Sequence, residues 1–466
     1  MSRLSRLPIL GIATALAVSG VLLTQNTGAV PVAQTDSVTA QKSQEQYVYR
    51  VKQAVKDSER LLGLGSDVLE ERDGDDLFVL GGADEGERIR AAGFTATVES
   101  VMPAAKWNPP KAQRDAGPIS RADAEETYYG GYRTVRAHHA HLDKVAADFP
   151  ALSSLVTYGQ SWRKSTGKGG YDLKAICLTK KAAGDCEQKP SSAKPRFFLM
   201  AQIHAREITT GDMAWRWIDH LTANYGKDAE VTKLMDSTEM WVVPITNPDG
   251  VEIVQQGGNS PKLHRKNAND SNGASCGIGG QVGIDLNRNS NTHFGGSGTS
   301  TDPCSEIYRG PSASSEVETK ALEGLLGKLY PDTRGEGDST AASADTKGMM
   351  ITLHSYTNGI IFPWSHKSNA KTGNDASLRA MAKDMAGITG YTYGTAPEVV
   401  GYAASGGTDD WIYDKLGVPG YTFEIGARSG ACSGFLPQYS CQESTHWPKI
   451  KPALMYAAGK AAAPYK

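Results

Sequence analysis

The chain has no excess of charge of either sign. Its 49 Lys and Arg residues nearly balance its 51 Asp and Glu residues, and the formal net charge is −2 over 466 residues. Proteins that bind nucleic acids usually carry a basic patch or stripe, and no basic motif with interleaved aromatic residues occurs here. We therefore expect no nucleic-acid partner. The length allows a large globular domain together with a smaller one.

Long apolar runs are scarce, and only one approaches the length that crosses a bilayer. Arg3 and Arg6 precede LPILGIATALAVSGVLL, and small residues follow at 27–29. This order is typical of a secretory signal peptide, although the run is close to the shortest membrane-spanning length. Because the run contains Gly and Ser and no basic residue directly follows it, we predict a signal peptide over 1–29. The protein is then secreted, with no membrane association after removal of this segment.

Closely spaced CxxC pairs, which zinc sites favour, are absent. The six cysteines form an even set, and an even number in an exported protein is typical of disulfides. Many pairings of six cysteines are possible in principle, but these fall into three couples along the chain. We predict disulfides between Cys177 and Cys186, Cys276 and Cys304, and Cys432 and Cys441.

Residues 30–115 differ from the rest of the chain and form a small unit with a linker. EQYVYRVK, DDLFVLGG and FTATVESV predict strands, and DEGERIRAAG predicts a helix. The linker MPAAKWNPPKAQRDAGPIS is rich in Pro, Lys and Arg, which is typical of an exposed, cleavable segment. The unit is either an ordinary N-terminal domain or a pro-segment. Its position between a signal peptide and a basic linker favours a pro-segment that an activating protease removes.

Residues 116–466 alternate between apolar strands and amphipathic helices. The predicted strands are YDLKAICLT, PRFFLMAQI, MWVVPIT, MMITLHSY and GYTFEIG, and helices such as TTGDMAWRWIDHLTANYG and DASLRAMAKDMAGITG lie between them. Several of these strands are apolar on both faces. We therefore predict an α/β domain with a mixed, largely parallel central sheet flanked by helices, preceded by a small α+β pro-segment.

Polar side chains follow several of the predicted strands, and sites in open α/β sheets form outside the carboxyl ends of strands. His204 follows FFLMAQI, His354 follows MMITL, and Asn247 ends WVVPIT in an NPDG turn. His204 and Glu207 are three residues apart, so both can face one point. With His354 they form a three-ligand zinc set that leaves a fourth position open. The alternative for His204 is a hydrogen-bonded histidine at a strand end.

Glu424 lies within GYTFEIG, a strand otherwise built to be buried. An unpaired buried carboxylate is costly, so Glu424 either forms an ion pair with a neighbouring Arg or has a functional role. A carboxylate that faces a zinc-activated water acts as a general base. Arg206, Arg265 and Arg288 lie in nearby motifs and suggest an anionic substrate or an oxyanion. A surface position is the alternative for Arg265.

Six motifs together resemble the zinc carboxypeptidases of the carboxypeptidase A/B type (M14-like). They are HARE, HRKN, DLNRN, LHSY, GYAASGGTDDW and TFEIG, in the family's order over about 125–455. The resemblance implies a bacterial secreted member that binds one Zn²⁺ ion through His204, Glu207 and His354. It implies Glu424 as the general base for a zinc-activated water.

The resemblance also assigns roles in substrate binding. Arg288, with Asn287 and Tyr402, would hold the terminal carboxylate of a peptide or protein. Arg265 would polarise the scissile carbonyl and stabilise the oxyanion, and Arg206 would assist at a neighbouring subsite. We expect a monomer that acts on the C-termini of peptides and proteins.

Asp409 and Ser365 stand at positions that resemble the basic-specific carboxypeptidase B type. An aspartate at the floor of an otherwise apolar pocket would pair with a Lys or Arg side chain. Alternatively, Asp409 caps the helix DDWIYDKLG, a role that Asp410 could share. We expect removal of C-terminal Lys and Arg, and of apolar residues too.

Two other functions are compatible with these residues. One is a metallopeptidase that acts on peptidoglycan stem peptides, some of which end in a free carboxylate. The other is a catalytically silent binding module of the same fold. A silent relative would be expected to lack a zinc ligand or the base, and this sequence has His204, Glu207, His354 and Glu424.

The remaining histidines suggest little. Those at 138, 139, 141, 220, 366 and 446 are predicted on polar faces or in loops. His264 and His293 are predicted in polar loops near the segments that carry the site.

Overall fold

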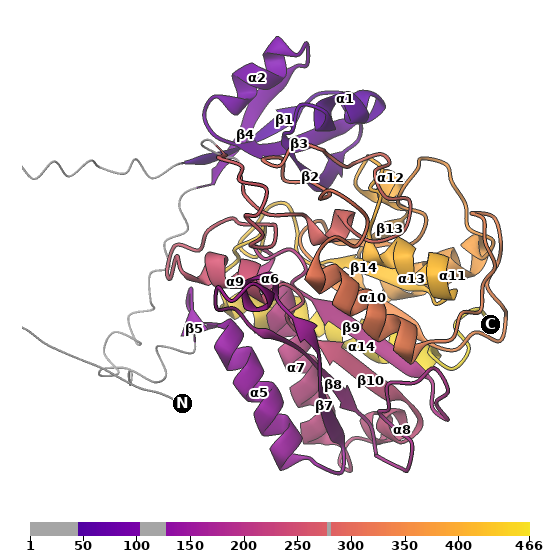
Figure 1. Cartoon of the computed structure of the whole chain (residues 1–466). Coiled ribbons are helices and arrows are strands. Elements are labelled where there is room, and N and C mark those ends of the chain that lie inside the picture. The colour runs from indigo at the N-terminus through magenta and orange to yellow at the C-terminus, as the bar shows by residue number, and fades with distance from the viewer. Residues whose placement is uncertain (1–44, 103–126, 277–280) are drawn as a thin grey trace, which may run out of the picture. The chain divides into compact units, whose positions relative to one another are not determined.

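The computed structural model describes residues 45–102, 127–276 and 281–466, which are coloured in Figure 1. All of them belong to one structural unit, Ser43–Lys466. The signal peptide predicted over 1–29 and most of the predicted linker lie outside the described residues. No helix in these ranges has both the length and the apolar composition needed to cross a bilayer.

A four-stranded antiparallel sheet forms the N-terminal part of the described chain, in the order β2-β3-β1-β4. Its strands are β1 (Gln46–Val51), β2 (Asp67–Asp73), β3 (Asp76–Gly81) and β4 (Ala96–Met102), and its helices are η1 (Val55–Asp57), α1 (Ser58–Leu62) and α2 (Glu85–Ala91). The predicted strands β1, β3 and β4 and helix α2 are confirmed. Strand β2 is not predicted from the sequence because DVLEERD is mostly charged and shows no apolar alternation.

An eight-stranded sheet forms the centre of the larger part, in the order β13-β12-β14-β11-β9-β10-β8-β7. Its strands are β7 (Ser153–Gln160), β8 (Asp172–Leu178), β9 (Arg196–Ala201), β10 (Glu239–Val243), β11 (Met349–His354), β12 (Gly359–Ile361), β13 (Thr392–Gly394) and β14 (Gly420–Glu424). Strands β14, β11, β9 and β10 run parallel to one another, and so do β12 and β13. The other three pairings are antiparallel. The predicted mixed, largely parallel sheet is confirmed.

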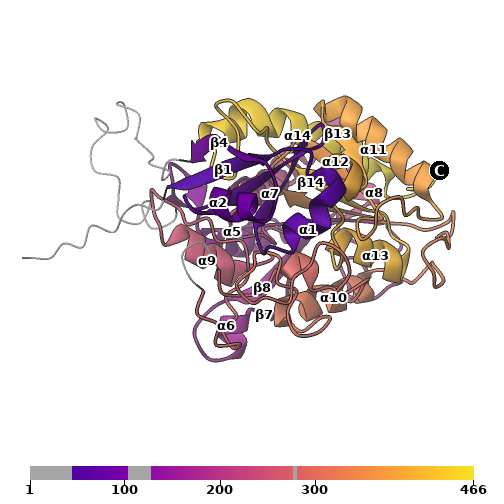
Figure 2. The same cartoon turned by 90° about the horizontal axis from the view of Figure 1, so that it is seen from above.

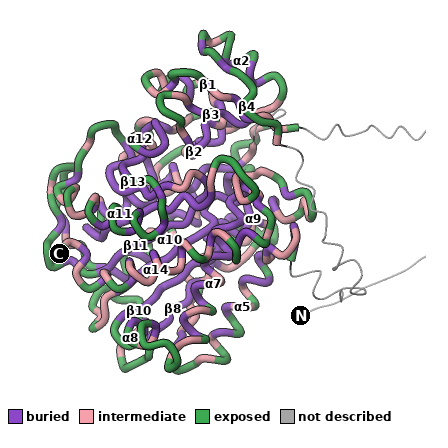
Figure 3. Tube along the Cα trace, turned by 180° about the vertical axis from the view of Figure 1, so that it is seen from behind, coloured by how far each residue is buried: buried purple, intermediate pink, exposed green. Residues whose placement is uncertain are grey.

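Helices pack on both faces of this sheet (Figure 2). One apolar cluster joins a face of the sheet to α5 (Val135–Asp148), α7 (Ile208–Asn224), α11 (Asp375–Thr389) and α14 (Trp447–Lys460). A second cluster joins the other face to α10 (Val317–Leu329) and α13 (Thr408–Leu416). Because the central strands are covered on both sides, their residues are apolar on both faces, and Figure 3 shows them as buried.

Shorter elements connect these layers. They are β5 (Thr127–Tyr128), β6 (Tyr132–Arg133), α6 (Trp162–Ser165), α8 (Ala229–Ser237), α9 (Pro248–Gln255), η2 (Leu286–Arg288), α12 (Ala396–Val399) and η3 (Gln442–His446). The NPDG sequence, predicted as a turn, begins helix α9 instead. The Asn247 side chain accepts a hydrogen bond from the backbone N–H of Gly250 at 3.0 Å, which caps the helix. Pro248 is the first helical residue, where no intrahelical bond requires an N–H.

All three predicted disulfides are confirmed. Cys177 pairs with Cys186, Cys276 with Cys304, and Cys432 with Cys441. Each bond closes a short local loop, so the cysteines pair with their nearest neighbour in the sequence.

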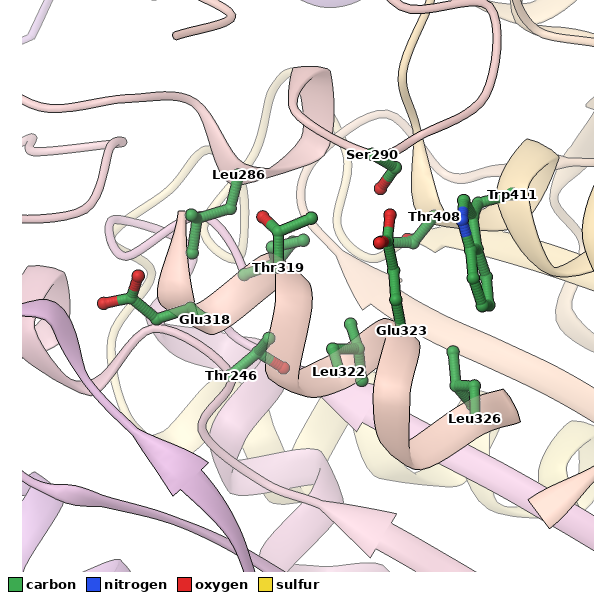
Figure 4. Close-up of a pocket in the computed structure, with 11 residues that line it drawn as sticks. Thr246, Leu286, Ser290, Glu318, Thr319, Leu322, Glu323, Leu326, Thr408 and Trp411 are labelled. Carbon is green, nitrogen blue, oxygen red and sulfur yellow. The ribbon is translucent and has the colours of Figure 1, made fainter. Parts of the chain in front are cut away.

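A buried glutamate borders a small, mostly apolar cavity beside α10. Figure 4 shows this cavity with Leu286, Leu322, Leu326 and Trp411 on its walls and Glu318 at one end. The Glu318 carboxylate accepts hydrogen bonds from the backbone N–H of Trp162 at 2.6 Å and from the Asn267 amide at 3.3 Å. Burial nevertheless raises the pKa of Glu318 to about 8.

This pKa predicts a pH-dependent stability. The folded state keeps the Glu318 proton up to about pH 8, whereas the unfolded chain releases it near pH 4.3. The free energy of unfolding therefore falls between these values as the pH rises, by up to about 1.4 kcal/mol per pH unit. Glu318→Gln should remove this part of the decline, which urea unfolding from pH 4 to 9 would measure against wild type. Parallel pH profiles for the two proteins would contradict the prediction.

Candidate metal centre and active site

Three strands of the sheet bring the predicted site residues to one edge. Strands β9, β11 and β14 run parallel, so their carboxyl ends lie together. His354 and Glu424 are register partners at the ends of β11 and β14. His204 follows β9 by three residues, and Glu207 precedes the first residue of α7. All four side chains are buried.

Three potential metal ligands converge at this edge. The Nδ1 atom of His204 lies 2.7 Å from Glu207 Oε1 and 3.1 Å from the Nδ1 atom of His354. His354 Nδ1 also lies 3.2 Å from Glu207 Oε2. These separations are close to those between the ligands of a tetrahedral zinc ion with bonds of about 2.0–2.2 Å. His204, Glu207 and His354 therefore form a candidate metal site.

The protonation of these groups fits a cation. Burial lowers the pKa of His354, which favours its neutral form. Although burial alone would lower the pKa of His204, the carboxylates of Glu207 and Asp285 raise it, so the negative charge around this ring favours a cation. Histidines bind Zn²⁺ in the neutral form. The His354 Nε2 atom is buried without a hydrogen-bond partner among the described residues. The donor set of two imidazoles and one carboxylate is one that Zn²⁺ prefers.

Asp285 contacts the ring nitrogen of His204 that does not face the other candidate ligands. Its Oδ1 atom lies 3.2 Å from His204 Nε2, so the imidazole can donate there and present Nδ1 to the metal site. Its Oδ2 atom accepts a hydrogen bond from Arg265 Nε at 3.0 Å. Asp285 also accepts from the backbone N–H of Asn287 at 2.9 Å, which fixes the turn that carries Arg288. The DLNRN motif contained this residue, but sequence reasoning gave it no role.

Glu424 faces the same space as the candidate ligands. It is 2% exposed, and its Oε2 atom has no hydrogen-bond partner within the described ranges. Burial, together with the negative charge of Glu207, raises the pKa of Glu424 well above its ordinary value. No salt bridge to an arginine forms in the described structure, which disfavours the alternative of a simple ion pair.

One polar cavity collects most of the predicted site residues. Residues from four parts of the predicted site line it, namely His204 and His354, Glu424, Asn287 with Arg288 and Tyr402, and Ser365 with Asp409. Apolar side chains complete the wall, from Ile361, Ala396, Val400 and Ala404. Glu70 of strand β2, which sequence reasoning did not identify, lines the cavity as well.

Arg206 and Arg265 are not among the residues that line this cavity. Acidic residues of β2 contact both of them. The Asp67 carboxylate accepts two hydrogen bonds from Arg206, one of 2.9 Å to Nη2. Glu70 Oε1 lies 2.6 Å from Arg265 Nη1. No sequence signal identifies these partners, since they are more than a hundred residues from the arginines along the chain.

The predicted specificity residues lie at one end of the cavity. The Oδ2 atom of Asp409 lies 3.3 Å from the hydroxyls of both Ser365 and Thr422. Burial and the neighbouring carboxylate of Asp410 raise the pKa of Asp409 to about 7. Asp409 is not the N-cap residue of α13, which is Gly407. The Asn287 side chain accepts a hydrogen bond from the backbone N–H of Thr408, the first residue of this helix, at 3.0 Å.

These features place the chain in a family. A family model described as zinc carboxypeptidase matches residues 138–445, and the chain belongs to this family, whose members use one Zn²⁺ ion. It is 32% identical to mouse (Mus musculus) Carboxypeptidase A2 over 313 residues, which cover 66% of this chain and 65% of that protein. It is 32% identical to human (Homo sapiens) Carboxypeptidase B over 324 residues, which cover 68% of each chain.

A solved structure supports the fold. The carboxypeptidase A from Helicoverpa armigera superposes with a TM-score of 0.68 at 20% identity, over 90% of this chain and 98% of that chain. The small N-terminal unit followed by the larger α/β domain is thus matched over nearly the whole length of that structure. The chain spans about two thirds of the mouse relative's length in the sequence comparison.

Proposed function

We propose that this protein is a secreted zinc-dependent carboxypeptidase that removes C-terminal residues from peptides. One observation carries the proposal. The cavity lined by the candidate zinc ligands His204 and His354 and by the Glu424 carboxylate is also lined by Asn287 and Arg288, which suit a terminal carboxylate. A silent binding module would not require the base and the ligands to be retained together.

The chemistry follows from the groups around the cavity. A bound Zn²⁺ would act as a Lewis acid that polarises a carbonyl and lowers the pKa of water. Glu424, with its raised pKa, is suited to accept a proton from the attacking water and to return it to the leaving amine. The guanidinium of Arg265, held by Asp285, would donate to the oxyanion that develops on the scissile carbonyl.

Recognition of a chain end requires a cation at a fixed distance from the base. Arg288 is 3% exposed, and its Nε and Nη1 atoms donate to the backbone carbonyls of Gly298 and Asn287 at 2.8 and 2.9 Å. These bonds hold the guanidinium in place in the cavity, where it can bind a carboxylate with Asn287. Tyr402 lies on the same wall and would close over a bound substrate.

The substrate side chain would point towards Asp409. This residue is 4% exposed and lies among apolar walls, so a Lys or Arg side chain would gain a charged partner there. Leu and Phe side chains would still bury apolar area against Ile361 and Val400. We therefore infer a preference for Lys and Arg with acceptance of apolar residues.

The role of Glu424 can be tested by Glu424→Gln. We expect kcat to fall by about 10²–10⁴-fold, because a proton acceptor is lost from the reacting water. The zinc content of the variant should equal that of wild type, since Glu424 is not a ligand. Hydrolysis of peptides ending in Arg and Leu, before and after chelation, provides the measurement. Turnover that persists in the variant would refute the role.

Asp409→Asn separates the two substrate classes. Loss of the charged partner should lower kcat/KM for peptides ending in Arg or Lys by about 10–100-fold, as expected for a hydrogen bond to a charged group. The kcat/KM value for peptides ending in Leu or Phe should change little. Asp384→Asn is the control, because this exposed carboxylate contacts the Tyr456 hydroxyl and does not line the cavity. An equal loss on both substrate classes would contradict the assignment of Asp409.

We further propose that residues 30–115 are a pro-segment that blocks the site. The support is an irregularity in β2. Asp67 and Val68 pair with Leu80 and Val79, but the next paired residue is Arg72 with Leu77. Three residues of β2 thus lie opposite one residue of β3, which makes a bulge. The bulge carries Glu70 out of the sheet and towards Arg265.

Strand β2 contacts residues that we propose to bind the substrate, so it would block substrate binding. The Asp67 carboxylate accepts a hydrogen bond from Arg206, and the Glu70 carboxylate accepts one from Arg265. Neither guanidinium is then free to bind a substrate. The Tyr402 hydroxyl donates to the backbone carbonyl of Val68 at 3.2 Å. Although burial alone would raise the pKa of Glu70, the guanidinium of Arg265 lowers it below its ordinary value, so the carboxylate is charged. Cleavage in the basic linker by an activating protease would release this strand.

A single substitution should release the block without cleavage. In the intact precursor, Glu70→Gln should raise hydrolysis of a C-terminal Arg peptide about 10-fold or more, because a buried charge pair is broken. The enzyme after linker cleavage should be unchanged. Glu71→Gln is the matched control, because its carboxylate in the same bulge contacts Arg428 at 3.0 Å instead. Equal activity of both precursors would count against the proposal.

Secretion is supported by the three disulfides, which are typical of exported proteins. The predicted signal peptide over 1–29 would direct export. We propose that the protein acts as a monomer, since all groups assigned to the site come from one chain.

A further inference from the structure

A second pair of histidines lies against the far side of the specificity residues. The imidazoles of His293 and His366 stack with centroids 3.4 Å apart and an interplanar angle of 7°. His366 lies in a loop, as predicted, but it is only 8% exposed and is therefore buried rather than on a polar surface. It is buried because the segment after β12 packs Trp364 into the core and bonds to α13.

The Nε2 edges of the two rings share one carboxylate. His293 Nε2 lies 3.0 Å from Asp338 Oδ1, and His366 Nε2 lies 3.4 Å from Asp338 Oδ2. The Trp364 indole donates to the backbone carbonyl of Asp338 at 3.0 Å and holds its loop. In the neutral tautomer that donates from Nε2 to Asp338, each ring has its lone pair at Nδ1.

The Nδ1 edge of His366 faces a second carboxylate, that of Asp410. His366 Nδ1 is buried with no hydrogen-bond partner in the described structure, and it lies 3.5 Å from Asp410 Oδ2. His293 Nδ1 lies 3.1 Å from the Thr292 hydroxyl. Potential ligand atoms of His293, His366 and Asp410 all lie within 4.8 Å of one another. A buried lone pair that faces a buried carboxylate is unfavourable unless a proton or a metal ion lies between them.

We propose that His293, His366 and Asp410 form a second metal site, for a divalent transition-metal ion such as Zn²⁺. Two imidazoles and a carboxylate suit Zn²⁺ and its neighbours, whereas Ca²⁺ and Mg²⁺ prefer oxygen ligands alone. A tetrahedral ion requires ligand separations of about 3.3 Å, so binding draws the loop of His293 towards Asp410. His293 is the half-buried member and gives the ion access from solvent.

The arrangement repeats that of the candidate zinc centre. There, His204 presents Nδ1 to the ligand cluster while Nε2 faces the carboxylate of Asp285. Here, His366 presents Nδ1 to Asp410, while the Nε2 atoms of both rings face Asp338. In both clusters, one ring nitrogen faces the potential ligands and the other contacts a carboxylate that orients the ring. This arrangement is typical of histidines that bind metal ions.

The second site would adjoin the specificity pocket. Asp410 accepts hydrogen bonds from the backbone N–H groups of Ser365 and His366, at 2.9 and 3.1 Å. The Ser365 hydroxyl in turn contacts Asp409. An ion at Asp410 would therefore hold the segment that forms the pocket, although metal binding itself does not depend on the proposed peptidase activity.

Zinc stoichiometry of the full chain tests the proposal. After removal of metal, equilibrium dialysis against about 10 µM free Zn²⁺, a level typical of moderate protein sites, should load two ions per chain. His293→Gln and His366→Gln should each retain one ion, and Glu207→Gln should also retain one. His141→Gln is the control, since His141 bonds to Asp219 and stacks on Trp215 instead.

The retained ion serves as an internal check on folding. A variant of the second site that still binds one ion at the catalytic centre is folded. If His366→Gln does not fold, His293→Gln still tests the proposal, because His293 is only half-buried. Loading with Co²⁺ should give two absorption components in wild type and one in His293→Gln. One zinc ion in wild type, or two in both histidine variants, would overturn the proposal.

Discussion

The candidate active site depends on one fully buried carboxylate. Asp285 joins the His204 imidazole, the Arg265 guanidinium and the backbone of Asn287. A candidate ligand, the proposed oxyanion donor and the turn proposed to bind a carboxylate therefore share one hydrogen-bond partner. Removing one partner of such a buried network leaves charges without compensation, at a cost of about 3–5 kcal/mol. The parallel ends of β9, β11 and β14 supply the frame, and Asp285 sets the orientation within it.

Much of this site could be predicted from the sequence because it lies at strand ends. Apolar runs such as FFLMAQI and MMITL predict buried parallel strands, and the carboxyl ends of such strands meet. His204, His354 and Glu424 are therefore expected together before any coordinates are known. The disulfides were also predictable, because each pairs cysteines that are neighbours in the sequence.

Other parts could not be predicted because they depend on contacts distant in sequence. Strand β2 is a charged segment, and its bulge is visible only in its register with β3. The partners of Asp67 and Glu70 are arginines in distant loops of the larger domain. His366 begins a polar-looking segment, HKSNAKTGND, yet it is buried beside Trp364 and α13. In each case the local sequence carries no information about the partner.

The bulge in β2 has a consequence for how a precursor could survive its own activity. Strand β2 meets Tyr402 and the arginines through a main-chain carbonyl and side-chain carboxylates in the middle of a continuous chain. An enzyme that recognises only chain ends finds no end there. Strand β2 would then place carboxylates in the site, as a product would, but without a free C-terminus that the enzyme could remove. The precursor would therefore not digest its own pro-segment from within.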